Sequence, residues 1–171
     1  MLDVEIDELT ESIQDALTGD RFDTRIKVAT VADIRRLSKK WTFDWKQEHQ
    51  EREVFRLIAP AIGATTQGLI SLERHKDHVF VNLLESHPQN VGRSKRYAGV
   101  PGNLMAFAAK LSFDDGHGGF VVFVAKTELI EHYQVTLGAV RIGRSARMII
   151  NEPAAMKLID KYFGGYDGTN T

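Results

Sequence analysis

The sequence contains no cysteine, which excludes disulfides, thiolate-bound metals and cysteine nucleophiles. It also contains no run of roughly 18 apolar residues, and its acidic first part, residues 1–17, lacks the apolar stretch of a signal peptide. The histidines show no paired spacing with carboxylates typical of zinc, so no metal is predicted. We therefore expect a cytoplasmic protein without a membrane partner.

An excess of charge of one sign is missing as well. The chain has 22 Lys and Arg residues against 23 Asp and Glu residues, for a net charge of -1. This balance provides no general attraction to nucleic acid, so no nucleic-acid partner is expected. A length of 171 residues with 43% hydrophobic composition is typical of a single domain with its own core, and we assign residues 1–171 to one domain.

The two ends of the chain carry separate predictions. Ile6, Leu9, Ile13 and Leu17 follow the spacing of an amphipathic helix, so an extra N-terminal helix is predicted within residues 1–20. The glycine-rich residues 164–171 are predicted to form a flexible tail.

Between these ends, strand-like and helix-like patterns alternate. Strands are predicted at 25–29, 53–59, 66–73, 78–84, 120–125 and 148–150. Helices are predicted from 30, at 103–113, at 127–138 and from 153, with a broken helix or loop at 39–52. The strands at 53–84 form an antiparallel meander, and helix 103–113 connects strand 78–84 to a parallel strand at 120–125.

A basic, glycine-punctuated segment, residues 90–104, connects an apolar strand to an apolar helix. The N–H groups at a helix N-terminus have no partner within the helix and carry partial positive charge. A phosphate satisfies both deficits, and Arg93, Lys95 and Arg96 add charge. The segment is therefore a candidate phosphate-binding loop.

The order of the elements resembles that of the GNAT N-acetyltransferase superfamily. A bacterial branch of this superfamily is resembled more closely by the short sequence motifs at 82–85, 90–92, 95–97, 126–133 and 137–139. The resemblance covers residues 25–163. It implies an α/β (α+β) fold with a mixed, mostly antiparallel central sheet, helices on both faces and a splayed central strand pair. It also implies acetyl-CoA as cofactor, bound by Leu84, Ser86, Arg93, Lys95, Arg96, Tyr97, Ala98, Gly99, Val100, Gly102 and Asn103.

Two positions depart from the superfamily pattern. Its diphosphate loop reads Arg or Gln, two residues, Gly, one residue, then Gly or Ala, and here Pro101 stands at the final small position after Arg96 and Gly99. Proline offers no N–H to a phosphate. In addition, Gly138 lies one residue further from Tyr133 than is common in the superfamily.

Glu85 and Tyr133 are the candidate catalytic residues. Strict alternation places Glu85 at the end of an apolar row with Val79, Val81 and Leu83, where it is suited to act as the base that takes the amine proton. An ion pair with Arg93 or Arg96 is the structural alternative. Tyr133 is suited to return a proton to the CoA sulfur, or it is an ordinary core residue.

Backbone N–H groups of residues 84–86 are the expected donors to the developing oxyanion. Trp41, Phe43 and Trp45 either wall an acceptor pocket or fill a core, and the core is favoured.

These features predict an acetyl-CoA-dependent N-acetyltransferase that acts by direct attack of a primary amine of a small molecule, peptide or protein. The alternative is a catalytically weak acyl-CoA-binding or interaction module, which Pro101 and the displaced Tyr133 favour. A toxin that acetylates aminoacyl-tRNA is a third hypothesis, against which the near-neutral charge argues. The sequence leaves open the acceptor and the choice between a monomer and a homodimer.

Overall fold

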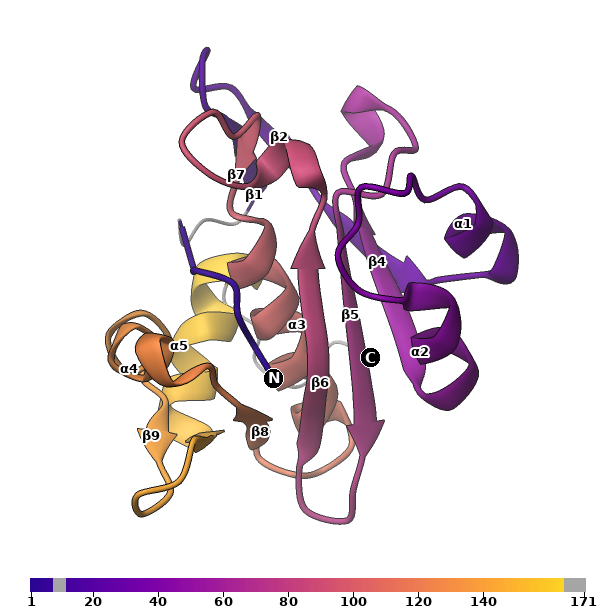
Figure 1. The fold of residues 1–171 in the computed structure, drawn as a ribbon. Helices are drawn as coiled ribbons and strands as arrows, with labels where there is room; N and C mark the ends of the chain where they lie inside the picture. The colour runs from indigo at the N-terminus through magenta and orange to yellow at the C-terminus, as the bar shows by residue number, and fades with distance from the viewer. Residues whose placement is uncertain (8–11, 165–171) are drawn as a thin grey trace.

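The computed structural model describes residues 1–7 and 12–164. Its central sheet consists, in chain order, of β3 (Arg25–Val28), β4 (Glu53–Ile58), β5 (Gly68–Arg74), β6 (Val79–Ser86), β8 (Val121–Val124), β9 (Val140–Arg141) and β10 (Arg147–Ile150). The spatial order is β3-β4-β5-β6-β8-β10-β9, and only the central β6–β8 pair is parallel (Figure 1). This confirms the predicted mixed, mostly antiparallel sheet.

Helices cover both faces of this sheet. They are α1 (Val31–Arg35), α2 (Trp45–Glu51), α3 (Val100–Asp114), α4 (Ile130–Leu137) and α5 (Glu152–Phe163), with short 3-10 turns η1 (Pro60–Ile62), η2 (Pro88–Asn90) and η3 (Thr127–Leu129). The larger core lies between the sheet and α3 and α5, and a smaller core lies under α1 and α2 (Figure 1). No helix in the described part of the chain is long and apolar enough to cross a membrane.

The connection from β6 through α3 to β8 is the predicted parallel crossover. Helix α3 begins at Val100, whereas the sequence predicted a start at residue 103. Pro101 suits the first helical turn, where a missing N–H leaves no helical hydrogen bond unmade. Gly99–Gly102 is therefore the start of the helix itself rather than a loop that precedes it.

The N-terminal helix predicted within residues 1–20 is wrong for the residues that the structure describes. Ser12–Asp15 form strand β1, which pairs with β2 (Arg21–Asp23) and β7 (Tyr97–Ala98) in a second, three-stranded sheet. Ile6 and Ile13 are buried as predicted, with Ile13 in β1, but Leu17 is exposed. Leu9 and residues 165–171 of the predicted tail lie outside the described residues. Pairing with β7 overrides the weak helical period of this short segment.

The segment at residues 39–52 contains a loop followed by α2. Asp44 caps this helix by accepting a hydrogen bond from the Gln47 N–H (3.0 Å). Trp41 and Trp45 are buried in the smaller core, with Phe43 packed against it. The core interpretation is therefore confirmed for Trp41 and Trp45, whereas Phe43 also lines a cleft.

A bulge in β6 changes which residues share a face. Opposite β5, Ser71 pairs with Leu83 but Leu72 pairs with Val81, so β6 carries one extra residue at Asn82. An extra residue inverts the alternation of side chains beyond it. Val79 and Val81 pack into the larger core, whereas Leu83 packs against the smaller one. The single row of Val79, Val81, Leu83 and Glu85 predicted from strict alternation is therefore wrong.

Candidate functional site: a fork between two parallel strands

The central strands diverge beyond the bulge. β6 and β8 pair only from Val79 with Val121 to Val81 with Phe123. β6 continues to Ser86 along β5, while β8 continues along β10, where the Ala125 N–H donates to the Ala146 carbonyl (2.9 Å). We call the gap between residues 82–86 and residues 124–126 the fork.

The fork edge of β6 carries backbone donors. The His87 N–H donates to the Gln67 carbonyl on the β5 side (2.8 Å). Because N–H groups alternate between the two edges of a strand, the N–H groups of Ser86 and Leu84 face the fork. The side-chain hydroxyl of Ser86 is buried and lines the same space, and it has no hydrogen-bond partner among the described residues. Of the predicted backbone donors of residues 84–86, those of Leu84 and Ser86 thus face the fork, and that of Glu85 faces β5.

The first seven residues, which we call the N-terminal segment, run through the fork (Figure 1). Leu2 pairs with Ala125 in parallel: the Leu2 N–H donates to the Val124 carbonyl (2.7 Å), and the Lys126 N–H donates to the Leu2 carbonyl (2.8 Å). The segment thus pairs with the chain just beyond the point where β6 and β8 stop pairing.

The side-chain carboxylate of Asp7 lies at the start of α3. Gly99 is the N-cap of α3, with φ of 100°, a conformation that favours glycine. Its N–H donates to Oδ1 of Asp7 (3.1 Å), and Lys95 Nζ donates to Oδ2 of the same carboxylate (3.0 Å). The predicted phosphate-binding loop therefore binds a carboxylate in this structure, as expected for a helix N-terminus with an adjacent lysine.

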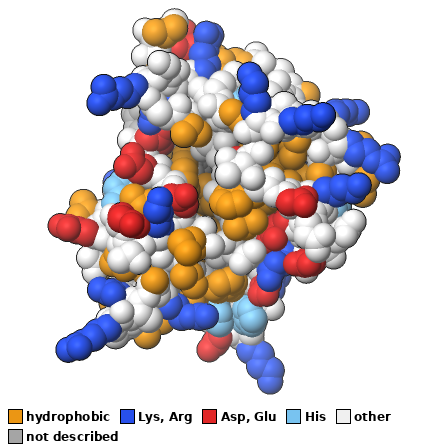
Figure 2. Space-filling view, in the orientation of Figure 1, with side chains coloured by type: hydrophobic (Ala, Val, Ile, Leu, Met, Phe, Trp, Pro, Cys, Tyr) orange, Lys and Arg blue, Asp and Glu red, His pale blue; other side chains and the backbone are white. Residues whose placement is uncertain are grey.

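A cleft of about 520 Å³ joins the fork to this anion site. Figure 2 shows apolar side chains along the middle of this face of the molecule, with acidic groups beside them. The cleft is lined by Asp3, Val4, Glu5, Asp7, Thr42, Phe43, Leu84, Glu85, Ser86, Asn90, Val91, Gly92, Lys95, Pro101, Lys126, Glu128 and Leu129.

Glu85 forms one wall of the cleft and is 9% exposed. Its carboxylate accepts three hydrogen bonds, from the N–H groups of Thr42 (2.6 Å) and Phe43 (3.1 Å) and from Nε1 of Trp45 (2.8 Å). Three convergent donors hold the 41–45 loop against the sheet. The predicted ion pair with Arg93 or Arg96 is not what holds Glu85, because Arg96 pairs with Asp15 instead (3.3 Å).

The chain is similar to solved structures of other proteins. No protein-family model and no curated protein matches the sequence. The AtaT–AtaR complex bound to DNA superposes with a TM-score of 0.57 at 16% identity, over 79% of this chain and 99% of that chain. AtaTR bound with acetyl-CoA gives 0.53 at 14% identity, over 80% and 98%. The KacTA–DNA complex gives 0.54 at 13% identity, over 80% and 98%.

AtaT and KacT are GNAT acetyltransferases. The chain has the GNAT fold. The expected architecture, including the parallel central pair that diverges, is therefore confirmed. At these identities the match establishes the GNAT fold and leaves the chemistry to the residues of this chain.

Tyr133 lies in the core of the fold, and its hydroxyl contacts the N-terminal segment. The side chain is 0% exposed and packs edge-on against Phe123. Its hydroxyl donates to the Val4 carbonyl of the N-terminal segment (2.5 Å). Burial raises the pKa of this phenol well above its ordinary value. The hydroxyl is thus engaged by the N-terminal segment rather than directed to an open sulfur site.

The predicted cofactor-binding residues separate into two groups. Leu84, Ser86 and Lys95 line the cleft, and the Gly99 N–H faces it through Asp7. Tyr97 is buried against Phe22, and the Asn103 side chain donates to the Gly99 carbonyl (2.7 Å). The remaining predicted residues, Arg93, Arg96, Ala98, Val100 and Gly102, do not line the cleft.

Arg96 is held away from the cleft by Asp15. The N–H groups of Leu17 (2.8 Å) and Thr18 (3.1 Å) both donate to Asp15 Oδ1. These two bonds, with Arg96 contributing less, lower the pKa of Asp15 below its ordinary value. Asp15 lies on β1, the strand for which the sequence predicted a helix, so this pair was not predictable from spacing.

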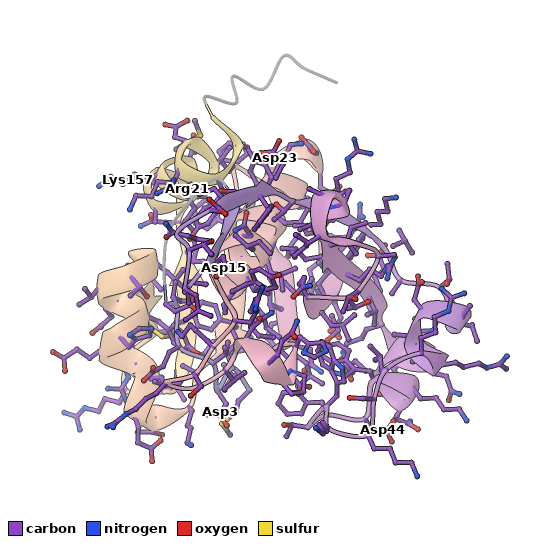
Figure 3. All side chains as sticks on the ribbon, turned by 90° about the horizontal axis from the view of Figure 1, so that it is seen from above. Asp3, Asp15, Arg21, Asp23, Asp44 and Lys157 are labelled. Atoms are coloured by element: carbon purple, nitrogen blue, oxygen red, sulfur yellow. The ribbon has the colours of Figure 1, made fainter. Side chains whose placement is uncertain are left out.

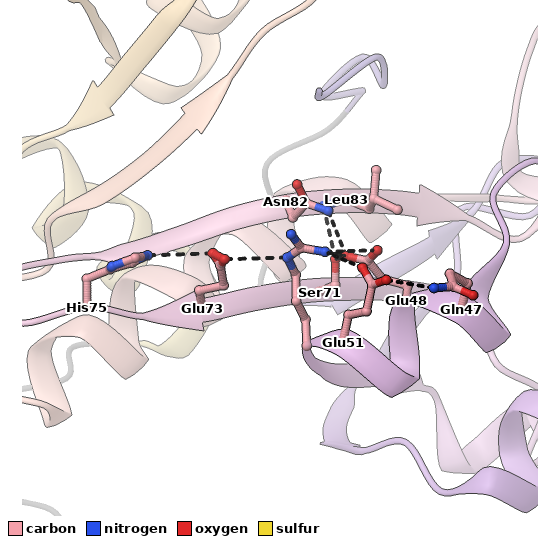
Figure 4. Close-up of polar contacts among 9 residues, drawn as sticks. Gln47, Glu48, Glu51, Ser71, Glu73, His75, Asn82 and Leu83 are labelled. Atoms are coloured by element: carbon pink, nitrogen blue, oxygen red, sulfur yellow. Dashed lines mark hydrogen bonds and ion pairs between the residues drawn. The ribbon is translucent and has the colours of Figure 1, made fainter.

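A second buried carboxylate, Glu48 on α2, was missed by the sequence analysis. It is 6% exposed and accepts hydrogen bonds from Ser71 Oγ (2.6 Å) and Asn82 Nδ2 (2.7 Å) (Figure 4). Asn82 is the bulged residue of β6, so Glu48 fastens α2 to the bulge. The signal available in the sequence was a lone Glu in a charged helix, which carries no indication of burial.

Within 1–7 and 12–164, no three side chains of His, Asp or Glu come together as a metal site.

Proposed function

We propose that the chain is an acetyl-CoA-dependent N-acetyltransferase that transfers the acetyl group to a primary amine by direct attack. The observation that carries the proposal is the position of the fork directly beside an anion-binding helix start, Gly99 with Lys95. A thioester joined through an extended arm to a diphosphate needs both features at once. The GNAT fold of this chain, shared with a structure of AtaTR bound with acetyl-CoA, supports the same cofactor.

In this proposal, the diphosphate binds the first turn of α3. The N–H groups of Gly99, Val100 and Gly102 lie at or within that turn, and Lys95 supplies a cation. Pro101 contributes no N–H, so this site has one donor fewer than the superfamily pattern implies. Arg93 lies exposed on the preceding loop, where it is suited to approach the nucleotide part of the cofactor.

The extended arm of the cofactor runs in the fork, and the thioester lies beside residues 84–86. The N–H groups of Leu84 and Ser86 are proposed to hydrogen-bond the arm and the carbonyl oxygen, whose negative charge grows during attack. The amine nitrogen forms a bond to the carbonyl carbon, the carbon–sulfur bond breaks, the amine loses a proton and the thiolate gains one. Tyr133 is the proposed proton donor to the sulfur, and this role requires that its bond to Val4 is broken.

Glu85 is proposed to position the acceptor side of the cleft. Its three hydrogen bonds to residues 42, 43 and 45 order the loop that faces the thioester. The assignment of Glu85 as the base stays a prediction, and both oxygens of its carboxylate accept hydrogen bonds from the 41–45 loop. A lysine-like amine needs roughly 4–5 kcal/mol to lose its proton at neutral pH, whereas an α-amino group needs only about 1 kcal/mol. An acceptor with an α-amino group therefore fits this site best.

The alternative, an acyl-CoA-binding module without turnover, is favoured by Pro101 and by the engagement of Tyr133 with Val4. Thiol release from acetyl-CoA, measured with a panel of α-amines and lysine-like ε-amines, separates the two functions. We expect amine-dependent release, faster with α-amines. Binding of CoA with no release above the amine-free rate for any acceptor selects the module.

A further inference from the structure

The N-terminal segment occupies the places that the proposed function gives to acetyl-CoA. Its backbone pairs with the edge of β8 in the fork, through Leu2 with Val124 and Lys126. An extended pantetheine arm would need that same space.

The carboxylate of Asp7 occupies the diphosphate position. It accepts from the Gly99 N–H and from Lys95 Nζ, the donors proposed for phosphate oxygens. The distance from the fork to the helix start is thus spanned by residues 2–7 of the chain, with a polar backbone in the fork and an anion at the end.

The acid of the proposed reaction is also engaged by this segment. The Tyr133 hydroxyl donates to the Val4 carbonyl, and Nε2 of His132 accepts from the Ile6 N–H (2.8 Å). Departure of the segment would release the Tyr133 hydroxyl into the space beside the sulfur.

Charge opposes cofactor entry while the segment is in place. Asp3, Glu5 and Asp7 line the cleft, together with Glu85 and Glu128. Two of these segment carboxylates neutralise the lysines of the cleft, because Lys95 pairs with Asp7 and Lys126 pairs with Asp3 (3.4 Å). Phosphates repel the three segment carboxylates and would instead attract the two lysines.

We infer that residues 1–7 are an internal competitor of acetyl-CoA: the segment fills the fork and the anion site, and acetyl-CoA binds only when the segment leaves. This inference rests on the proposed function, since it assigns the same site to both occupants. Leu2 and Ile6 are buried in the core, so they anchor the closed state. The apparent affinity for cofactor is then lowered by the fraction of molecules that are closed.

Asp7→Asn tests the inference in the whole 171-residue chain, because it keeps the shape of the segment and removes its anion. We expect the Kd for CoA, measured by calorimetry, to fall about tenfold relative to the unmodified protein. In hydrogen exchange, the amides of residues 1–7 should lose protection when CoA is saturating. Removal of the whole segment is less informative, because loss of Leu2 and Ile6 from the core could unfold the protein.

The matched control is Asp23→Asn, which changes the net charge equally. Asp23 is exposed on β2 and lies across the molecule from Asp3 (Figure 3). Its Kd for CoA should stay within about twofold of the unmodified protein. Two results would overturn the inference and leave the proposed function standing. One is the same Kd for CoA in the unmodified protein, Asp7→Asn and Asp23→Asn. The other is that the amides of residues 1–7 keep their protection from hydrogen exchange when CoA is bound. Absence of CoA binding by every variant, Asp7→Asn included, would remove the proposed function and the inference together.

Discussion

Glu85→Gln is expected to slow acetyl transfer about 100-fold while the shape of the pH–rate profile stays the same. Oε1 of Glu85 accepts from Phe43 and Trp45, and Oε2 accepts from Thr42. A glutamine retains one acceptor oxygen but presents an NH₂ group to the remaining N–H donor. That buried donor loses its partner, at about 1–3 kcal/mol of folding free energy, and the 41–45 loop shifts at the cleft wall.

The measurement is kcat/KM against pH for the unmodified protein and for Glu85→Gln, with melting temperature as the check on folding. Glu131→Gln is the control, since Glu131 is an exposed carboxylate on α4 that does not line the cleft. It should change the rate by less than about threefold, as surface substitutions do. If Glu85→Gln removes the acid limb of the profile, Glu85 is the base and the positioning role is wrong.

Gly119→Ala should destabilise the fold by roughly 2–5 kcal/mol and lower the melting temperature by about 10 °C. Gly119 has φ of +81° and lies in the turn before β8. A Cβ there would lie 2.5 Å from Cε2 of Phe113 and 2.6 Å from Cβ of Ala155. The Ala155 atom belongs to α5, so relief requires movement of a whole helix away from α3 and the sheet.

Gly116→Ala measures the free-energy cost of a left-handed backbone alone, without the steric overlap that an added Cβ makes at Gly119. Gly116 lies in the same turn with φ of +83°, but a Cβ there would have no heavy atom within 4 Å beyond its chain neighbours. It should lose only about 1–2 kcal/mol, the cost of a left-handed backbone. Thermal unfolding of both variants provides the comparison, and equal losses would show that α5 does not pack against Gly119 as closely as described.

The fold was largely predictable because the patterns that define it are local and strong. The strand composition of β4 and β5, the apolar run of β8 and the helix stop at Gly138 each indicate their element directly, and the parallel crossover follows from their order. Trp41 and Trp45 were also placed in a core correctly.

The errors have a common physical origin in contacts between distant parts of the chain. Asn82, the extra residue of the bulge, donates its side-chain amide to Glu48, 34 residues earlier, and nothing in the local pattern of β6 marks it. β1 is a strand because Tyr97 and Ala98 pair with it. The occupation of the anion site by Asp7 joins residues 92 apart in the chain, so no spacing rule could predict it.

The measurement that tests the central claim most directly is a titration of the ¹⁵N-labelled protein with CoA, followed through its amide resonances. The account predicts saturable shifts of Leu84 and Ser86 in the fork and of Gly99 and Gly102 at the start of α3. Millimolar CoA that leaves these four amides unmoved, or that shifts only residues elsewhere on the surface, would contradict the claim that fork and helix start form one acyl-CoA site.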